Sequence, residues 1–294
     1  MRRRTCGTAR RVRHHGAMTS TEDALTRELL QTAQVLAQEA GRLIIDGRHA
    51  AHVTATKSSG VDIVTQMDVA SETLLRERLA ALRPGDGILG EEGDDVATAS
   101  GITWVLDPID GTVNYLYGLP SFAVSVAAVS GPPRSHDWTA LAGAVYDGTG
   151  RMWSAGRGLG AWCDDERLVR TDAPALSSTL LGTGFQYVAA RREVQGRIVT
   201  QLLPQVRDIR RLGAAAVDLC LVASGHLDAY YEHGLNAWDL AAGALIATEA
   251  GVRVAGIDGG APDEHLTIAA MPGAWQALRE ALVNAGAREP FSHL

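Results

Sequence analysis

Two aspartates three residues apart are the clearest chemical signal in the sequence. Asp107 ends an apolar run, Pro108 restricts the turn, and Asp110 stands immediately before Gly111 and Thr112. Two carboxylates on one rigid turn repel each other without a cation, and Mg²⁺ prefers such oxygen ligands while leaving positions for water and phosphate. The backbone N–H groups of the following turn can hold an anion. The segment predicts a metal site beside a phosphate-binding turn, and a capped turn with solvated aspartates is the alternative.

Three further acidic segments are compatible with the same site but are weaker signals on their own. Glu91 and Glu92 follow a short apolar run, and we expect only one of them to face a shared cavity, because adjacent side chains point in different directions. Asp239 opens an apolar helix, where it equally complements the helix dipole. Asp68 starts another helix, where it is also a candidate N-cap.

The elements that must position these residues follow from hydrophobic periodicity. A helix capped by Thr21 carries apolar residues as far as Ile44, and a second helix places Val69 and Leu82 on its apolar face. The predicted helices span residues 21–44, 68–82, 191–203, 213–223, 238–250 and 274–285. The predicted strands span residues 87–90, 102–106, 121–130, 139–147, 151–155, 179–183, 206–209, 227–232 and 266–270.

The order of these elements predicts an α/β (α+β) fold of stacked layers. We interpret residues 1–18 as a disordered basic extension, residues 19–170 as an α+β half with an antiparallel meander, and residues 171–294 as an α/β half. No repeat, low-complexity segment or long linker separates the two halves. We therefore expect them to share an interface.

The charge of the chain is unevenly distributed. The net charge is −7, but residues 1–17 hold six arginines and no acid, so the rest of the chain carries −13. An acidic body argues against nucleic acid as the main partner and is compatible with a cation-binding enzyme. The basic start lacks the apolar stretch of a secretory signal. We interpret it as an extension ahead of a second candidate start at Met18, with a nucleic-acid or membrane arm as the alternative.

The spacing of the cysteines and the length of the apolar runs indicate the cellular location of the protein. Cys6, Cys163 and Cys220 lie far apart and match no disulfide or zinc pattern, which is typical of a reducing cytoplasm. No uninterrupted apolar run approaches the ~18 residues that a membrane helix requires. Both observations predict a cytoplasmic protein.

Taken together, the acidic segments resemble the inositol monophosphatase family. The motifs that carry the resemblance are Gly90-Glu91-Glu92, Asp107-Pro108-Ile109-Asp110-Gly111-Thr112, Trp238-Asp239, the pair Asp62 and Asp68, and Arg211-Leu212-Gly213-Ala214-Ala215-Ala216 with Gly225. They occur in the order and spacing of the family from about residue 22 to about residue 286, and the likeness is greatest to its bacterial, actinobacterial branch. Gly93 stands where the family often has Ser, at a position that is not a ligand.

The resemblance implies a layered αβαβα sandwich that forms homodimers, binds two or three Mg²⁺ ions and is often inhibited by Li⁺. The implied metal ligands are Glu91, Asp107, the backbone carbonyl of Ile109, Asp110 and Asp239. Among them, Asp107 would bridge two ions.

The resemblance also implies catalytic and substrate-binding residues. Asp68 and Thr112, with Glu91, would orient and activate the attacking water. The backbone N–H groups of Gly111 and Thr112 would hold the phosphate. The implied substrate-side residues are Gly111, Thr112, Arg210, Arg211, Gly213, Ala214, Ala215, Glu232 and Asp239. Because the two arginines are adjacent, we expect only one to face the site, and a surface ion pair or a dimer contact is the other interpretation.

The resulting prediction is a Mg²⁺-dependent phosphoric monoester hydrolase that converts inositol 1-phosphate to myo-inositol and phosphate without a covalent phosphoenzyme. Alternative substrates are histidinol phosphate, a 3′-phosphoadenosine nucleotide, NADP and fructose 1,6-bisphosphate. A hypothesis of a different class is a non-catalytic regulator that binds RNA or a transcription factor. Every expected ligand position is filled, which favours the enzyme.

Overall fold

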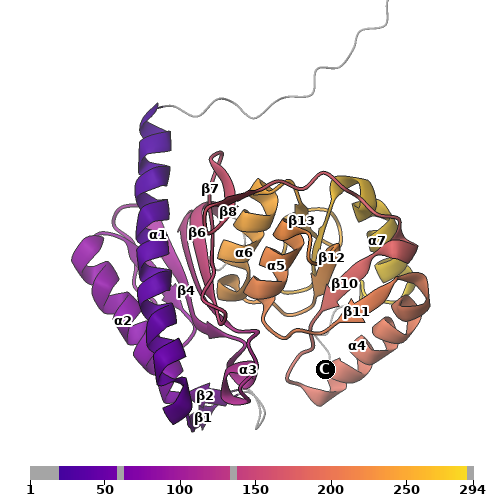
Figure 1. The fold of residues 1–294 in the computed structure, drawn as a ribbon, viewed down its shortest axis with the longest axis horizontal. Helices are drawn as coiled ribbons and strands as arrows, with labels where there is room; N and C mark the ends of the chain where they lie inside the picture. Colours follow the sequence, from indigo (N-terminus) through magenta and orange to yellow (C-terminus); the bar gives the residue numbers. More distant parts are fainter. Residues whose placement is uncertain (1–19, 58–62, 133–137, 290–294) are drawn as a thin grey trace, which may run out of the picture.

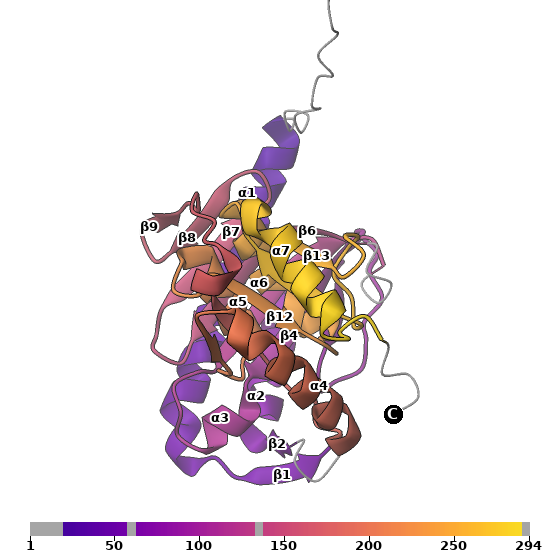
Figure 2. The ribbon, with the colours of Figure 1, turned by 90° about the vertical axis from the view of Figure 1, so that its right-hand side faces the viewer.

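The computed structural model describes residues 20–57, 63–132 and 138–289, which fold into alternating layers of helix and sheet (Figure 1). The predicted basic extension and Asp62 lie outside the described residues. In order across Figure 1, the layers are α1 with α2, a seven-stranded sheet, α5 with α6, a five-stranded sheet, and α4 with α7. Figure 2 views this stack end-on, with α4 and α7 nearest the viewer. This arrangement confirms the predicted αβαβα sandwich.

Helices α1 (Ser20–Gly47) and α2 (Gln66–Leu82) cover the outer face of the seven-stranded sheet. The predicted apolar face of α2 is wrong in part, because Leu75 is buried whereas Val69 is 51 % exposed and Leu82 is 49 % exposed. At 3.6 residues per turn, Val69 lies about 120° around the helix from Leu75, and Leu82 is the last residue of the helix. Between the two helices lie η1 (Arg48–Ala50) and the antiparallel strands β1 (Val53–Thr56) and β2 (Ile63–Thr65).

The seven-stranded sheet follows the chain order from β3 to β9. Its first two strands are parallel and all later neighbours are antiparallel, which confirms the predicted meander. Its strands are β3 (Gly87–Gly90), β4 (Ile102–Asp110), β5 (Ala123–Ser130), β6 (Thr139–Asp147), β7 (Met152–Gly156), β8 (Gly160–Cys163) and β9 (Glu166–Leu168). The short helix α3 (Thr112–Leu116) leaves the end of β4. The last two strands and α3 were not predicted.

Helices α5 (Ala215–Ser224) and α6 (Ala237–Glu249) lie between the two sheets and are apolar around most of their circumference. Small residues allow this close packing. A Cβ at Gly143 of β6 would lie 2.9 Å from the Cα of Ala242, and a Cβ at Gly243 would lie 3.0 Å from Leu219. Helix α6 is therefore packed tightly against both β6 and α5.

The five-stranded sheet has the order β11-β10-β12-β14-β13. Strand β10 is parallel to both of its neighbours, and β14 is antiparallel to both of its own. The strands are β10 (Leu180–Thr183), β11 (Asp208–Arg210), β12 (Ala229–Glu232), β13 (Arg253–Gly256) and β14 (Thr267–Ala270). Its outer face carries α4 (Ala189–Leu202) and α7 (Pro272–Asn284), and the 3₁₀ turns η2 (Leu176–Ser178) and η3 (Leu203–Gln205) complete this half.

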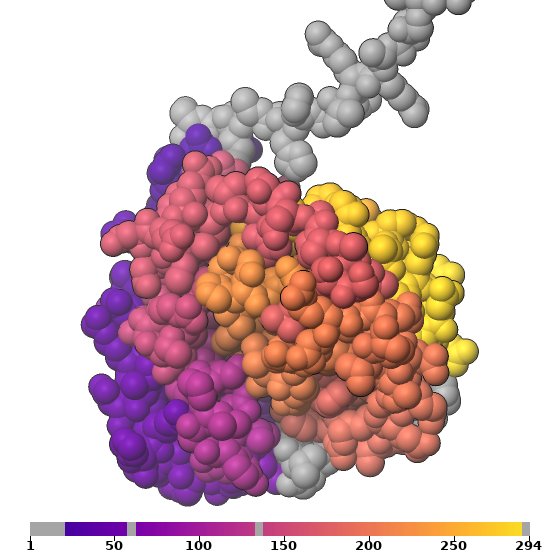
Figure 3. Space-filling view, turned by 45° about the vertical axis from the view of Figure 1, so that its right-hand side comes forward, coloured from indigo at the N-terminus to yellow at the C-terminus, as the bar shows by residue number. Residues whose placement is uncertain are grey.

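The predicted helices and strands of the second half are confirmed, with ends shifted by no more than two residues, and only β13 is missing from the prediction. Figure 3 shows the earlier, indigo-to-magenta segments packed against the orange segments along one face. None of the helices in the described part of the chain is both long and apolar enough to cross a membrane.

Candidate active site

Strand β4 carries one extra residue between its two aspartates. Asp107 pairs with Ser125 of β5 and Asp110 pairs with Ala123, so three steps along β4 match two along β5. In a regular strand, residues three apart point to opposite faces, but this bulge turns both carboxylates towards α5 and α6. Ile109, between them, packs instead in the core beneath α1 and α2. The strand was predicted to end at Asp107, and it continues because of this irregularity.

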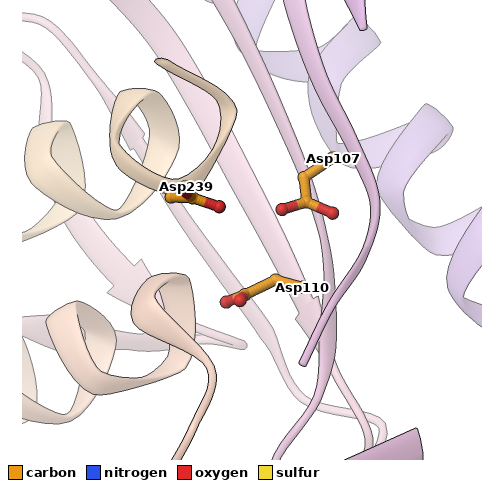
Figure 4. A group of neighbouring side chains, drawn as sticks. All are labelled: Asp107, Asp110 and Asp239. Atoms are coloured by element: carbon orange, nitrogen blue, oxygen red, sulfur yellow. The ribbon is translucent and has the colours of Figure 1, made fainter. Parts of the chain in front are cut away.

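A third carboxylate joins the two from helix α6. Asp239 lies in the first turn of α6, where its Oδ2 accepts a 2.6 Å hydrogen bond from the backbone N–H of Asn236. One carboxylate oxygen from each of Asp107, Asp110 and Asp239 lies within 4.8 Å of the others. Figure 4 shows the three side chains pointing towards one another from β4 and α6. The fold therefore brings together residues that are 132 positions apart in the sequence.

The three carboxylates form a site that suits a hard cation. Burial raises the pKa of Asp107 well above its ordinary value, and nearby Glu91 adds to the rise. Burial likewise raises the pKa of Asp110 to about 7 and of Asp239 to about 8. Within the described ranges, no lysine or arginine forms an ion pair with any of the three. An all-oxygen set of crowded carboxylates is the donor chemistry of Mg²⁺, Ca²⁺ or Mn²⁺.

Asp110 has a second function, because it caps helix α5. Its carboxylate accepts hydrogen bonds from the backbone N–H groups of Ala215 at 3.2 Å and Ala216 at 2.7 Å. Ala214, the N-cap residue, has no side chain that could bind these groups. Of the two alanines for which the resemblance implied substrate contacts, Ala215 lines the cavity and Ala214 does not.

Asp68 connects helix α2 to the turn at Gly111 and Thr112. The N-cap of α2 is Thr65, and the Oδ2 of Asp68 accepts from the Thr65 backbone N–H at 2.8 Å and from its hydroxyl at 2.5 Å. The other oxygen, Oδ1, accepts from the Thr112 hydroxyl at 3.2 Å, and that hydroxyl also lies 3.0 Å from the carbonyl oxygen of Ile109. Burial raises the pKa of Asp68. The Thr112 hydroxyl is thus held at the cavity wall by two buried acceptors.

The turn after β4 requires a glycine. Gly111 has φ +84°, and a Cβ there would lie 2.8 Å from the carbonyl oxygen of Ser121. The amide of Asn114, one turn later, donates to Ser121 O at 2.6 Å and to Leu212 O at 2.7 Å. This single side chain connects the turn after β4 to the loop that carries Gly213 and the start of α5.

Glu91 faces the same cavity, but its carboxylate is engaged by a lysine. The Nζ of Lys57 donates to Glu91 Oε1 at 2.6 Å and to Glu92 Oε1 at 2.5 Å. Burial alone would lower the pKa of Lys57, but the attraction of Glu91 and Glu92 raises it overall. Burial raises the pKa of Glu91 to about 7. Sequence reasoning missed Lys57 as a site residue, because an isolated lysine in a polar loop has no diagnostic spacing.

Glu232 lies in the same cavity at the end of β12. The Tyr230 hydroxyl donates to its Oε2, and burial raises the pKa of Glu232 to about 7. A Cβ at Gly184 would lie 2.0 Å from this carboxylate, so only glycine leaves room for it. Gly213 also lines the cavity, so the structure brings Glu232 and Gly213, for which the resemblance implied substrate contacts, into one cavity.

The two adjacent arginines point in different directions, as expected. Arg211 lines the cavity, and its guanidinium carbon lies 6.0 Å from the centroid of the Phe185 ring. Arg210 is exposed, forms a 2.6 Å ion pair with Asp208 and is not among the residues that line the cavity. The structure therefore places Arg211 at the site and Arg210 at the surface.

Comparison with known proteins identifies the family in which this arrangement of residues occurs. The model of the inositol monophosphatase family matches residues 25–288. The chain belongs to the inositol monophosphatase family. Inositol-1-monophosphatase of Mycobacterium leprae is 52 % identical over 238 residues, 77 % of this chain and 80 % of that protein. Nus factor SuhB of Pasteurella multocida is 39 % identical over 236 residues, 79 % of this chain and 86 % of that protein.

Solved structures support the same family. The structure of Mycobacterium tuberculosis SuhB has a TM-score of 0.76 and 45 % identity, covering 90 % of this chain and 99 % of that one. The family resemblance predicted from the acidic motifs is thereby confirmed. As a member of the inositol monophosphatase family, the chain is a phosphatase that acts on a small phosphate ester.

The raised carboxylate pKa values predict a pH-dependent stability for this inositol monophosphatase family member in the absence of divalent cations. A carboxyl whose pKa is higher in the folded than in the unfolded chain favours folding at low pH, and this contribution is lost as pH rises through the folded pKa. With Asp110 and Glu232 at about 7 and Asp239 at about 8, we expect Tm in EDTA to fall by about 5 °C between pH 7 and pH 9. Differential scanning fluorimetry measures this.

Saturating Mg²⁺ is the control, because a cation bound by ionised carboxylates removes the penalty and binds more tightly as pH rises. The range starts at pH 7 since His233, whose pKa burial lowers to about 4, affects stability at lower pH. A Tm in EDTA that rises from pH 7 to pH 9 would contradict the assignment of a crowded carboxylate cluster.

Proposed function

We propose that this phosphatase hydrolyses inositol 1-phosphate to myo-inositol and phosphate with two or three Mg²⁺ ions as cofactor. The observation that carries the proposal is one cavity of about 580 Å³ that contains the carboxylates of Asp107, Asp110 and Asp239, the turn at Thr112, and Glu232. Residues proposed to bind a cation, a phosphate and a substrate hydroxyl group thus line one cavity. The inositol-1-monophosphatase of Mycobacterium leprae supports the same substrate.

The proposed roles of the residues follow from their contacts. Bound Mg²⁺ would supply the positive charge that phosphoryl transfer requires. The Thr112 hydroxyl donates to Asp68, so its oxygen can accept a hydrogen bond from the attacking water and orient it. The carboxylate of Asp68 attracts the proton that the water loses. The backbone N–H groups of Gly111 and Thr112 bind the phosphate. Asp107, Asp110, Asp239, the carbonyl of Ile109 and Glu91 are proposed to hold the cations.

The substrate side of the cavity suits a polyol. Glu232 presents a carboxylate that can accept hydrogen bonds from ring hydroxyls, while the hydroxyl of Tyr230 fixes its orientation. Arg211, Gly213 and Ala215 line the same region. Homodimer formation, inhibition by Li⁺ and a cytoplasmic location stay predictions from the resemblance and the composition.

A substrate panel tests the proposal. We expect kcat/KM for inositol 1-phosphate to exceed that for histidinol phosphate, a 3′-phosphoadenosine nucleotide, NADP and fructose 1,6-bisphosphate by about tenfold or more. The hydroxyl groups of these compounds are fewer than, or placed differently from, those of an inositol ring, and a buried acceptor left without its hydroxyl partner costs binding energy. Phosphate release is measured with and without Mg²⁺. A larger kcat/KM for histidinol phosphate would overturn the choice of substrate, and Mg²⁺-independent release would overturn the choice of cofactor.

A second candidate function is suggested by one relative. The Pasteurella multocida protein is a Nus factor SuhB, and this chain begins with an arginine-rich segment that suits RNA. Under this hypothesis the chain binds RNA or a transcription partner. An RNA complex that is weakened by salt and lost on deletion of residues 1–17, together with absent hydrolysis, would favour it over the enzyme.

A further inference from the structure

Three buried polar residues on one face of helix α2 reach three different parts of the candidate active site. Asp68, Ser71 and Glu72 are three and four residues apart, so their side chains lie on the same side of the helix. Asp68 accepts from the Thr112 hydroxyl. The Ser71 hydroxyl donates to the carbonyl of Pro108 at 3.0 Å, within the bulge of β4. Glu72 is the third member of this face, and its contacts lead to the loop after β3.

Glu72 binds the backbone of the loop that carries Glu91. Its Oε2 accepts from the N–H of Glu92 at 2.8 Å, and its Oε1 accepts from the N–H of Gly93 at 2.8 Å. The side chain of Glu72 is only 3 % exposed, and hydrogen bonds to a charged group are stronger where water is excluded. One buried carboxylate therefore holds the two peptide groups that directly follow Glu91.

An arginine and two glycines fit closely around this contact. Arg76, one turn after Glu72, donates from Nε to Glu72 Oε1 at 2.7 Å and from Nη1 to the carbonyl of Asp94 at 2.8 Å. A Cβ at Gly90 would lie 2.4 Å from Glu72 Oε1, and a Cβ at Gly93 would lie 2.8 Å from the same atom. A side chain at either position would have to displace the carboxylate, so the two glycines allow its close approach to the loop.

The position of this loop decides where the carboxylate of Glu91 lies. Glu91 lines the same cavity as the three converging aspartates. Its carboxylate is bound by Lys57, which follows β1 and also binds Glu92. A carboxylate on a loop can serve as a cation ligand only if the backbone that carries it stays in place. Because Glu72 binds the two peptide groups after Glu91, it restricts the positions that this carboxylate can reach.

We propose that Glu72, held by Arg76, is a positioning residue that fixes the loop of residues 91–93 and thereby sets the affinity of the site for the cation that Glu91 binds. The inference rests on the proposed function, because it takes Glu91 as a ligand of Mg²⁺. Glu72 is not among the residues that line the cavity, so it acts through the loop. Removal of such a partner of a metal ligand lowers metal affinity by about 10- to 100-fold.

Glu72→Gln tests the inference by titration calorimetry with Mg²⁺. Glutamine keeps the shape of the side chain, but its NH₂ group cannot accept from a backbone N–H and it no longer pairs with Arg76. We expect the Kd of the binding step that Glu91→Gln weakens to rise about tenfold or more. At saturating Mg²⁺, kcat should stay within about threefold of the wild-type value, because the bound ion holds Glu91 in place. Glu77→Gln is the matched control, since Glu77 is exposed on the same helix and its Kd should not change.

A double-mutant cycle with Glu91→Gln distinguishes positioning from a purely structural effect. If Glu72 acts through Glu91, the double variant binds Mg²⁺ no more weakly than Glu91→Gln alone, because the carboxylate that Glu72 positions is already absent. Losses that multiply in the double variant would show that Glu72 acts elsewhere. An unchanged Kd in Glu72→Gln would overturn the inference as well.

Arg76→Gln is the second variant, which carries the test if thermal melts show that Glu72→Gln is unfolded. The Arg76 side chain is 21 % exposed, so its loss is milder. We expect Kd to rise about threefold, and an unchanged Kd would overturn the inference.

Hydrolysis of inositol 1-phosphate by the wild type is recorded separately. If Mg²⁺ binds but no phosphate is released, the proposed activity fails alone. If the wild type binds no Mg²⁺, the proposed cofactor fails, and hydrogen exchange in EDTA decides on the loop. Backbone N–H groups of residues 92 and 93 should then exchange about tenfold faster in Glu72→Gln, and unchanged exchange would overturn the positioning.

Discussion

Asp110→Asn is expected to lower kcat by about 10³-fold at saturating Mg²⁺. Asp110 is one of the three converging carboxylates, so the amide removes a negative charge where a cation must bind. The fold should survive, because the amide oxygen can still accept from the Ala216 N–H. We expect the free energy of unfolding to change by only about 1 kcal/mol, since the lost cap bond is offset by weaker repulsion. Steady-state phosphate release and thermal melts measure both quantities.

The matched control for this variant is Asp165→Asn. Asp165 is exposed in the turn between β8 and β9 and lies outside the cavity, so the same chemical change there should leave kcat unaltered. Near-wild-type hydrolysis by Asp110→Asn with saturating Mg²⁺ would show that the carboxylate cluster is not the reaction centre.

Thr112→Val is expected to lower kcat by about 10²- to 10⁴-fold, with a much smaller change in KM. Valine has the shape of threonine but lacks the hydroxyl that contacts Asp68 and the Ile109 carbonyl. The backbone N–H of residue 112, which is proposed to bind phosphate, is retained. The variant therefore separates orientation of the water from binding of the substrate. Initial rates over a range of substrate concentrations give kcat and KM separately.

Thr112→Ser provides the rescue, because serine keeps the hydroxyl and loses only a methyl group. We expect this variant to retain most of the wild-type kcat. If serine is as inactive as valine, the defect comes from packing of the turn, and the proposed role of the hydroxyl is wrong.

Much of the fold was accessible from the sequence, because long helices and strands repeat their apolar residues over several turns or pleats. The helices at 238–250 and 274–285 were placed within two residues. Helix α3 and strand β13 were not, although strands as short as β3 were, because α3 mixes polar with apolar residues and β13 begins with an exposed arginine, so neither forms an apolar run. The apolar face of α2 was also misjudged, because burial depends on which part of the helix contacts the sheet.

For the candidate site, the sequence predicted the carboxylates but not the contacts that other side chains make with them. The spacing of Asp107 and Asp110 indicated a metal site, and the family resemblance added Asp239; the fold brings the three together. The ion pair of Lys57 with Glu91 was not foreseen. Contacts between side chains on separate loops leave no regular pattern in the sequence, so only the three-dimensional arrangement reveals them.

The extra residue in β4 makes the length of this segment more important than most of its side chains. A single inserted residue between Asp107 and Asp110 would change the pleat parity and direct the second carboxylate into the apolar core beneath α1 and α2. Most surface loops absorb insertions at little thermodynamic cost. Here an insertion or deletion of one residue would separate the two carboxylates. The segment between Asp107 and Asp110 therefore tolerates substitutions better than changes in its length.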